Sequence, residues 1–550
     1  MFIASDRTVC PRNSAASSSS AGVSDAPTAR ASGSSVPCDE VALGGASHRE
    51  AAPPTFPASD ARGSSDAASS KVALNPRPGA PGIGDPYFPL LGNGGYDAQH
   101  YTIDASVDVD ANRLAATTTM NARATQDLSS FNLDFRGFDI SRITVDGAPA
   151  TFARKDGELT VSPANAIANG TDFSVAVTYS GVPVPHESPS APAPVGWKKY
   201  DGGIAVDSEP DGASSWFPCN DHPRDKATYT FKIDAPAQYT VAANGLLQQT
   251  AVHDGRKTWV YEAKDPTASY LATVQIGSFV EQKDVGPNNL PIRNFFPPDM
   301  ADAAKYDFGR TPEMISFLSQ KFGPFPLEAY GACVVPQSLV GGALECQTMS
   351  VFDPFVVTGD RSNENVVVHE LGHQWCGDNV SVKNWKDIWL NEGFASYIEW
   401  LWQEHTQGSD SVKQTAQQVY EWAKSREGSA FERGVPAAEP PDAVRKMLNA
   451  VRHGLEQRAH GAVEIGQPPP DDLFDEAVYM KGALTLYALR QKLGDDAFFN
   501  GMRTYVAQFA RGNAEISDFR GVMEKVSGQK LGDFFNGWLY STTMPADFHP

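Results

Sequence analysis

Two histidines four positions apart are the residues of this chain best suited to chemistry. His369 and His373 enclose Glu-Leu-Gly, and eighteen residues separate His373 from Glu392, which lies in Trp-Leu-Asn-Glu-Gly. On a helix, positions i and i+4 share one face, so both imidazoles can reach one ion, and Glu392 offers a third ligand. Two nitrogens and a carboxylate suit catalytic zinc, which keeps a fourth position open for water. We predict one Zn²⁺ per chain at His369, His373 and Glu392.

Glu370 lies between the two histidines in sequence and, on a helix, points away from the face that they share. We predict that it is the general base, which takes a proton from the water activated by the metal and later passes it to the leaving amine. Ligands and base together indicate a hydrolase. They argue against a non-catalytic peptide-binding pseudoenzyme, which would usually lack a ligand or the base.

The first half of the chain has the pattern of short strands. Residues 100–110, 227–234 and 269–280 alternate polar and apolar side chains, and Gly, Asn, Asp or Pro separates such segments. Repeated short strands with turn residues between them are typical of an all-β sandwich. We therefore predict an N-terminal β domain over residues 86–286.

The second half mixes helical and strand patterns. Apolar residues recur at helical spacing in 307–323, and 366–378, 394–405 and 481–494 also suit helices, whereas 328–336 and 347–353 suit strands. This predicts an α+β domain over residues 287–550. The stretch 428–472 is rich in Pro, Gly and charge at its edges, and we predict that it is an insert with one helical piece around 443–457.

Residues 1–85 are dominated by Ser, Ala, Pro and Gly, so we predict a disordered, low-complexity tail. No apolar stretch has the length of a membrane helix or a secretory signal, which slightly favours a cytoplasmic over a secreted protein. The formal charge of −21 argues against nucleic-acid binding. Six cysteines without a CxxC pair indicate reduced thiols, although one disulfide between Cys333 and Cys346 stays open.

The zinc motif belongs to a longer pattern. The sequence reads His-Glu-Leu-Gly-His-Gln-Trp at 369–375, Trp-Leu-Asn-Glu-Gly-Phe-Ala at 389–395, Gly-Ala-Leu-Glu-Cys at 342–346 and Tyr-Met-Lys-Gly at 479–482. With Glu209-Pro210 and the later Pro218-Cys219, it resembles the gluzincin aminopeptidases of the aminopeptidase N and leukotriene A4 hydrolase superfamily. The resemblance covers about residues 86–550 and implies a saddle-like β domain followed by a thermolysin-like catalytic domain.

The resemblance also implies roles for residues outside the zinc motif. Glu345 and Glu209 would bind the free α-amine of the substrate, and the backbone of Gly342 and Ala343 would lie along the peptide. Tyr479 would donate a hydrogen bond to the oxyanion of the tetrahedral intermediate.

The chain departs from the family pattern at three positions of these segments. Leu344 and Cys346 replace a Met and an Asn, and Ser214 stands in place of an Arg. Ser214 puts the local support of Glu209 in doubt.

These observations predict a zinc-dependent aminopeptidase that hydrolyses the N-terminal bond of peptides with a free N-terminus. The alternative is a zinc endopeptidase with an open cleft, because the resemblance is to a short form without the helical C-terminal domain that walls off the cleft in many members. The preferred first side chain and the oligomeric state stay open.

Overall fold

The computed structural model describes residues 74–191, 193–427 and 462–550. Most of the predicted tail and the helical piece around 443–457 lie outside these residues. Of the predicted tail, residues 74–85 are described, and they are ordered: β1 (Arg77–Pro78) pairs with a strand of the β region, and Asp85 is buried. The ordered chain therefore begins before residue 86, because Asp85 has partners far along the chain that its Gly- and Pro-rich surroundings do not reveal.

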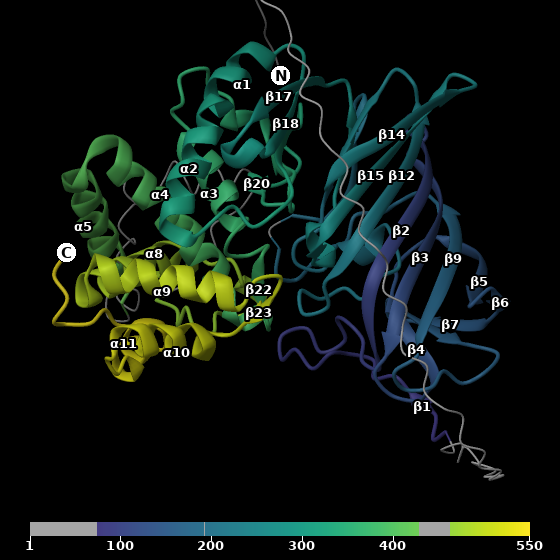
Figure 1. The fold of residues 1–550 in the computed structure, drawn as a ribbon, viewed down its shortest axis with the longest axis horizontal. Coiled ribbons are helices and arrows are strands. Elements are labelled where there is room, and N and C mark those ends of the chain that lie inside the picture. The colour runs from purple at the N-terminus through teal and green to yellow at the C-terminus, as the bar shows by residue number, and fades with distance from the viewer. Residues whose placement is uncertain (1–73, 192, 428–461) are drawn as a thin grey trace, which may run out of the picture. The chain divides into compact units, whose positions relative to one another are not determined.

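An eight-stranded sheet forms the body of the β region (Figure 1). Its spatial order is β14 (Leu246–His253), β15 (Arg256–Thr267), β12 (Ala227–Pro236), β2 (Tyr96–Asp108), β3 (Arg113–Ala124), β9 (Asp172–Gly181), β5 (Asp139–Val145) and β6 (Ala148–Pro149). Buried and less buried residues alternate along β2, β9 and β12. One face of this sheet therefore faces a core, as the period of two predicts.

Two four-stranded sheets complete the β region. The first has the order β1, β4 (Leu128–Asp134), β8 (Glu158–Ser162) and β7 (Thr151–Lys155), and the second has the order β10 (Gly196–Tyr200), β11 (Gly203–Asp207), β16 (Val274–Gly277) and β13 (Thr240–Ala243). Side chains of all three sheets share one hydrophobic core, which includes Ile103, Phe131 and Val206. Packed sheets around a common core match the predicted sandwich.

The predicted strand over residues 269–280 is wrong at its start. Residues Ser269–Leu271 form a 3₁₀ turn, Val274–Gly277 is a strand, and the next strand begins at Val280. The cause is Asn244, whose amide donates to the carbonyl of Leu271 and accepts from the backbone N–H of Thr273. A distant side chain thus satisfies backbone groups that a neighbouring strand would otherwise take.

The C-terminal half combines a five-stranded sheet with helices. The sheet has the order β17 (Val280–Val285), β18 (Pro291–Phe296), β19 (Tyr330–Val334), β21 (Ser350–Phe352) and β20 (Ala343–Leu344), and β22 (Val380–Val382) pairs with β23 (Gly512–Ala514). The described helices are α1 (Ala301–Asp307), α2 (Thr311–Phe322), α3 (Glu364–His373), α4 (Trp389–Gln407), α5 (Ser409–Ser425), α8 (Glu476–Leu493), α9 (Asp495–Gln508), α10 (Ile516–Ser527) and α11 (Gly532–Leu539). None of these helices has the length and apolarity needed to cross a membrane.

Helix α4 packs against both α3 and α8 in the largest hydrophobic core of the described residues. Glycines allow this close packing: a Cβ on Gly482 of α8 would lie 2.8 Å from the Cα of Gly393 in α4, and a Cβ on Gly372 of α3 would lie 2.8 Å from the side chain of Ile398. Backbones can approach to this distance only where the Cβ is missing. The three helices that carry the predicted chemistry are therefore held in close contact.

Buried hydrogen bonds join the β region to the helical half. Asp85 accepts from the backbone of Trp385 at 2.8 Å, and its carboxylate pairs with His222 at 3.1 Å. Lys226, which precedes β12, donates to the carbonyls of Asp378 and Asn379 in the loop after α3. The β region therefore supports the backbone next to the His-Glu-Leu-Gly-His motif.

Candidate metal centre and active site

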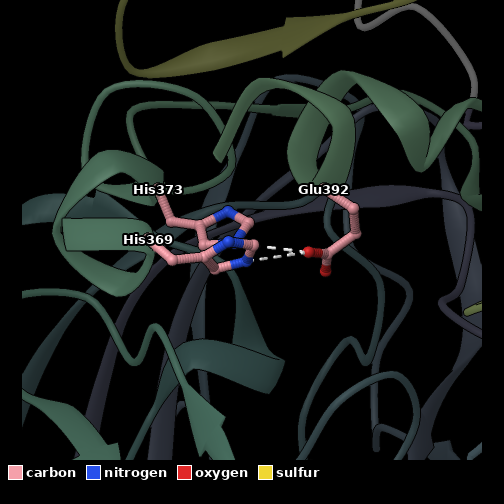
Figure 2. A group of neighbouring side chains, drawn as sticks. All are labelled: His369, His373 and Glu392. Carbon is pink, nitrogen blue, oxygen red and sulfur yellow. Dashed lines mark hydrogen bonds and ion pairs between the residues drawn. The ribbon is translucent and has the colours of Figure 1, made fainter. Parts of the chain in front are cut away.

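The three predicted ligands converge at the interface of two helices. His369 and His373 lie one turn apart on α3, and Glu392 lies in the first turn of α4 (Figure 2). All three are buried, and one carboxylate oxygen of Glu392 lies 3.3 Å from Nε2 of His369 and 3.4 Å from Nε2 of His373. Burial raises the pKa of Glu392, yet the two imidazoles lower it to about 2.

These distances fit a tetrahedral ion. Around zinc, with bonds of about 2.0–2.1 Å, two ligand atoms lie roughly 3.3–3.4 Å apart. The observed separations between Glu392 and the two imidazole nitrogens match that spacing. The set of two nitrogens and one oxygen is also one that zinc prefers in catalytic sites. The residues present therefore fit a catalytic zinc ion.

The other nitrogen of each imidazole is occupied. Nδ1 of His369 lies 2.8 Å from the carboxylate of Glu399, and Nδ1 of His373 lies 3.2 Å from the carbonyl oxygen of Cys376. Both partners accept a hydrogen bond from Nδ1–H, which leaves Nε2 of each ring as the nitrogen that would bind a metal ion. The rings are thereby oriented for a cation.

Sequence reasoning missed Glu399, although a signal was available. Glu399 lies seven residues, or two helical turns, after Glu392 on α4, so both carboxylates lie on the face of α4 that packs against α3. A buried acid at this spacing from a predicted ligand is a candidate to support one of the histidines.

Glu370 and Tyr479 lie beside the three ligands. Carboxylate oxygens of Glu370 and Glu345 and a ring nitrogen of His373 lie within 4.8 Å of one another. The ring of Tyr479, from α8, lies 6.2 Å from that of His369 and nearly parallel to it. Burial raises the pKa of Glu370 to about 8, and a cation held by its neighbours would lower that pKa again.

Two further carboxylates face the same space. Glu345 is buried, and one of its carboxylate oxygens has no hydrogen-bond partner among the described residues; the same holds for one oxygen of Glu209. Burial, then the negative charge of Glu345 and that of Glu392, raise the pKa of Glu209 well above its usual value. Buried carboxylate oxygens that have no partner among the described residues favour the binding of a cation.

Strand β20 forms an open edge next to these groups. Among the described residues it is the last strand of its sheet and pairs with β21 alone, through Ala343 with Phe352 and Leu344 with Val351. Gly342, just before it, is held by Asp353, which accepts from its N–H at 2.9 Å. A peptide can add to such an edge as a further strand.

The departures from the family pattern are buried but do not enter the site as ligands. Cys346 is a buried free thiol, as is Cys333, so the structure has no disulfide between them. Ser214 is buried, and its backbone N–H donates to Asp221 at 2.9 Å. Ser214 therefore bonds to Asp221, and no contact of its side chain with Glu209 is seen among the described residues.

Comparison with known proteins decides the family. Residues 306–538 match the peptidase family M1 domain, and residues 97–271 match the peptidase M1 N-terminal domain. The chain belongs to peptidase family M1. The predicted superfamily and the two-part fold class, a β-rich domain followed by an α+β catalytic domain, are thereby confirmed. The M1 chain is a zinc-dependent metallopeptidase.

Several M1 proteins are similar over much of this chain. It is 24% identical to leukotriene A-4 hydrolase of Xenopus laevis over 82% of this chain and 72% of that protein. It is 27% identical to glutamyl aminopeptidase of Rattus norvegicus, but spans only 35% of that protein's length. A crystal structure of a variant M1 zinc metallopeptidase from Deinococcus radiodurans, bound to Tyr-Ser-Ala, superimposes with a TM-score of 0.72 at 27% identity, over 85% of this chain and all of that one.

Proposed function

We propose that this M1 peptidase is an aminopeptidase that removes the first residue of peptides with a free N-terminus. The observation that carries the proposal is the convergence of Glu345 and Glu209, each with an unpartnered carboxylate oxygen, on the space beside the three ligands. An ammonium group bound there places the first peptide bond, and no later one, next to the ligands. Holding the substrate at this distance from the reacting groups is itself a large part of catalysis.

In this proposal His369, His373 and Glu392 hold the zinc ion. Zinc, when bound there, polarises the scissile carbonyl and makes a water molecule nucleophilic near neutral pH. Glu370 takes the proton of the attacking water and delivers it to the leaving amine. The edge of β20 at Ala343 binds the backbone of the peptide.

Tyr479 donates a hydrogen bond to the oxyanion that forms on the scissile carbonyl. Burial, with the nearby carboxylates of Glu392 and Glu209, raises the pKa of Tyr479 well above its usual value. The phenol therefore keeps its proton at the pH of the reaction and remains a donor. Loss of such a donor commonly lowers kcat by about 10²–10³.

The test compares free and blocked N-termini in the wild type and in Glu345→Gln. We expect the wild type to hydrolyse alanyl-coumarin and to leave N-acetylated peptides and internal bonds of casein uncut. Glu345→Gln removes the charge but keeps the shape, and it should lower kcat/KM on alanyl-coumarin about 10- to 100-fold, because the ion pair with the ammonium becomes a hydrogen bond to a neutral amide.

Two controls accompany this experiment. Zinc content should be equal in the wild type and in Glu345→Gln, and Glu421→Gln, at an exposed position on α5, should leave kcat/KM unchanged. Equal cleavage of acetylated and free peptides by the wild type would reject the amine anchor and support an open-cleft endopeptidase instead.

A further inference from the structure

A cavity of about 90 Å³ opens beside three of the residues just described. It is lined by Glu209, Tyr479 and Ala343 and extends from them between the β region and α8. In the proposed function, Glu209 holds the α-amine and Tyr479 the scissile carbonyl. The first Cα lies between these two groups, so the first side chain extends into this cavity. This step depends on the proposed function.

The walls of the cavity are apolar, but its lining also contains one ion pair. Apolar side chains come from Val195, Leu344 and Phe474. The ion pair joins Lys198 of β10 and Asp207 of β11, with 2.7 Å between Nζ and one carboxylate oxygen. Both side chains are about nine-tenths buried, at 10% and 6% exposed. Because this ion pair is buried, any polar atom that a bound substrate leaves without a hydrogen-bond partner costs free energy.

Both members of the pair have unused hydrogen-bonding capacity. Lys198 has three N–H groups; it donates to Asp207 and, at 2.7 Å, to the carbonyl of Leu339, which leaves one. The second carboxylate oxygen of Asp207 has no partner among the described residues. The lining of the cavity therefore includes one residue with an unused donor and one with an unused acceptor, next to each other and with no net charge between them.

We propose that this cavity selects a first residue whose uncharged side chain ends in a carboxamide, as in glutamine. The carbonyl oxygen of the amide accepts from Lys198, and its NH₂ group donates to Asp207. A glutamate has no donor and faces the charge of Asp207, and a lysine has no acceptor and faces Lys198. Methionine has nearly the same length as glutamine and fills the apolar part, but it matches neither polar group.

The experiment measures kcat/KM of the wild type on glutaminyl-, methionyl-, glutamyl- and lysyl-coumarin. Burial raises the pKa of Asp207 to about 7 even though Lys198 lowers it, so the assays are run at pH 8.5, where the carboxylate is ionised. We expect glutamine to exceed methionine and both charged residues by about tenfold or more, the size of effect seen when a buried polar group is matched or left unmatched.

Apolar variants then test the two residues directly. In Lys198→Met and in Asp207→Leu, the ratio of kcat/KM for glutamine to that for methionine should fall to about one or below, while zinc content stays at the wild-type level. The matched control is Lys199→Met: Lys199 is the next residue of β10, is exposed, and donates instead to the carbonyl of Asp110, so the ratio should be unchanged.

Three outcomes would overturn the inference, and they differ in what they reject. Wild-type enzyme that prefers methionine or a charged residue rejects the selectivity itself. Variants that lose activity equally on glutamine and methionine show that the ion pair only supports the fold. Enzyme that hydrolyses no aminoacyl-coumarin but cleaves N-acetylated peptides rejects the proposed aminopeptidase function, and this inference with it.

Discussion

Glu370 lies beside the predicted metal ligands: its carboxylate is within 4.8 Å of a ring nitrogen of His373 and of the carboxylate of Glu345. We expect Glu370→Gln to lower kcat by about 10²–10⁴, the range of general acid–base catalysis, with little change in KM. The amide keeps the shape of the side chain, and zinc content measured by atomic absorption should stay near one per chain. A variant that retains more than a tenth of wild-type kcat would show that another group moves the proton.

Glu399 is expected to act through His369 and not on the substrate. Glu399→Gln keeps an acceptor for Nδ1 but removes the charge, so zinc affinity should fall about 10- to 100-fold, as for other residues that orient metal ligands. Competition with a chelator gives the dissociation constant, and an excess of zinc should restore activity. Unaltered zinc affinity would mean that the 2.8 Å contact between Glu399 and His369 does not orient the ligand.

At the scale of residues, the sequence predicts those side-chain contacts that follow from spacing along one element. His369 and His373 share a helix face, so their convergence follows from a period of 3.6 residues, and the family pattern supplied Glu345, Glu209 and Tyr479. Their roles remain predictions until variants are measured. Lys198 and Asp207 could not be found in this way. Their pairing depends on the register of β10 on β11, and their place in the cavity lining depends on residues far away in the sequence, such as Tyr479 of α8.

At the scale of elements, the packing of α4 on α8 fixes where Tyr479 stands relative to Glu392. A Cβ on Gly482 would meet backbone atoms of Gly393 at 2.8 Å, and backbone cannot swing aside as a side chain can. We expect Gly482→Ala to destabilise the protein by about 1–3 kcal/mol and to lower kcat, because the helices must separate. Urea unfolding and kinetics on one preparation measure both effects.

The matched control for this variant is Gly521→Ala. Gly521 is an exposed interior residue of α10 with nothing within 4 Å of a built Cβ, so alanine there should be neutral or stabilise the protein by up to about 1 kcal/mol. If Gly482→Ala were as stable as Gly521→Ala, the close approach of α4 and α8 would not depend on glycine.

Sequence patterns located α2, α3, α4 and α8 among the described helices, but not all of their ends, and they did not locate α1, α5, α9, α10 or α11. The predicted helix over 366–378 ends in the structure at His373, and Gly377, with φ of 134°, turns the chain so that the N–H of Asp378 reaches the carbonyl of His373. This helix end depends on the turn at Gly377 and on Lys226 of the β region, which donates to the carbonyl of Asp378. Helical periodicity contains no information on either.

At the scale of the whole molecule, buried acids make stability depend on pH. Asp225, just before β12, accepts from the backbone of Ala98 in β2, and burial raises its pKa to about 8. An exposed aspartate has a pKa of about 4. Because the folded pKa is the higher one, the stability contributed by this group is complete below pH 4 and is lost as the pH rises towards 8.

Asp225→Asn should therefore flatten the stability profile over that window. Between pH 5 and pH 8.5, we expect the Tm of the wild type to fall by more than the Tm of the variant, whatever the absolute Tm of the variant is. Thermal unfolding followed by circular dichroism at several pH values measures both slopes. Parallel slopes would show that Asp225 titrates at the same pH in the folded and unfolded protein.

The sequence predicted that a β region is followed by an α+β region, but it did not predict where the described β region begins. Alternation of period two identified the β region and helical periodicity the second half, and the family comparison confirms this order. The predicted boundary between residues 286 and 287 stays a prediction. The ordered stretch at 74–85 was not predictable, because Asp85 owes its place to His222 and Trp385, more than a hundred residues away.

The position of Glu392 and Glu399 on one helix has a mechanical consequence. If α4 shifts or rotates, Glu392 and Glu399, which orients His369, move together. Ile398 of α4 packs against Gly372 of α3 and holds the two helices in register. We therefore expect substitutions that weaken the apolar packing between α3 and α4 to raise the dissociation rate of zinc before they unfold the protein. The dissociation rate of zinc would then report how tightly the core is packed.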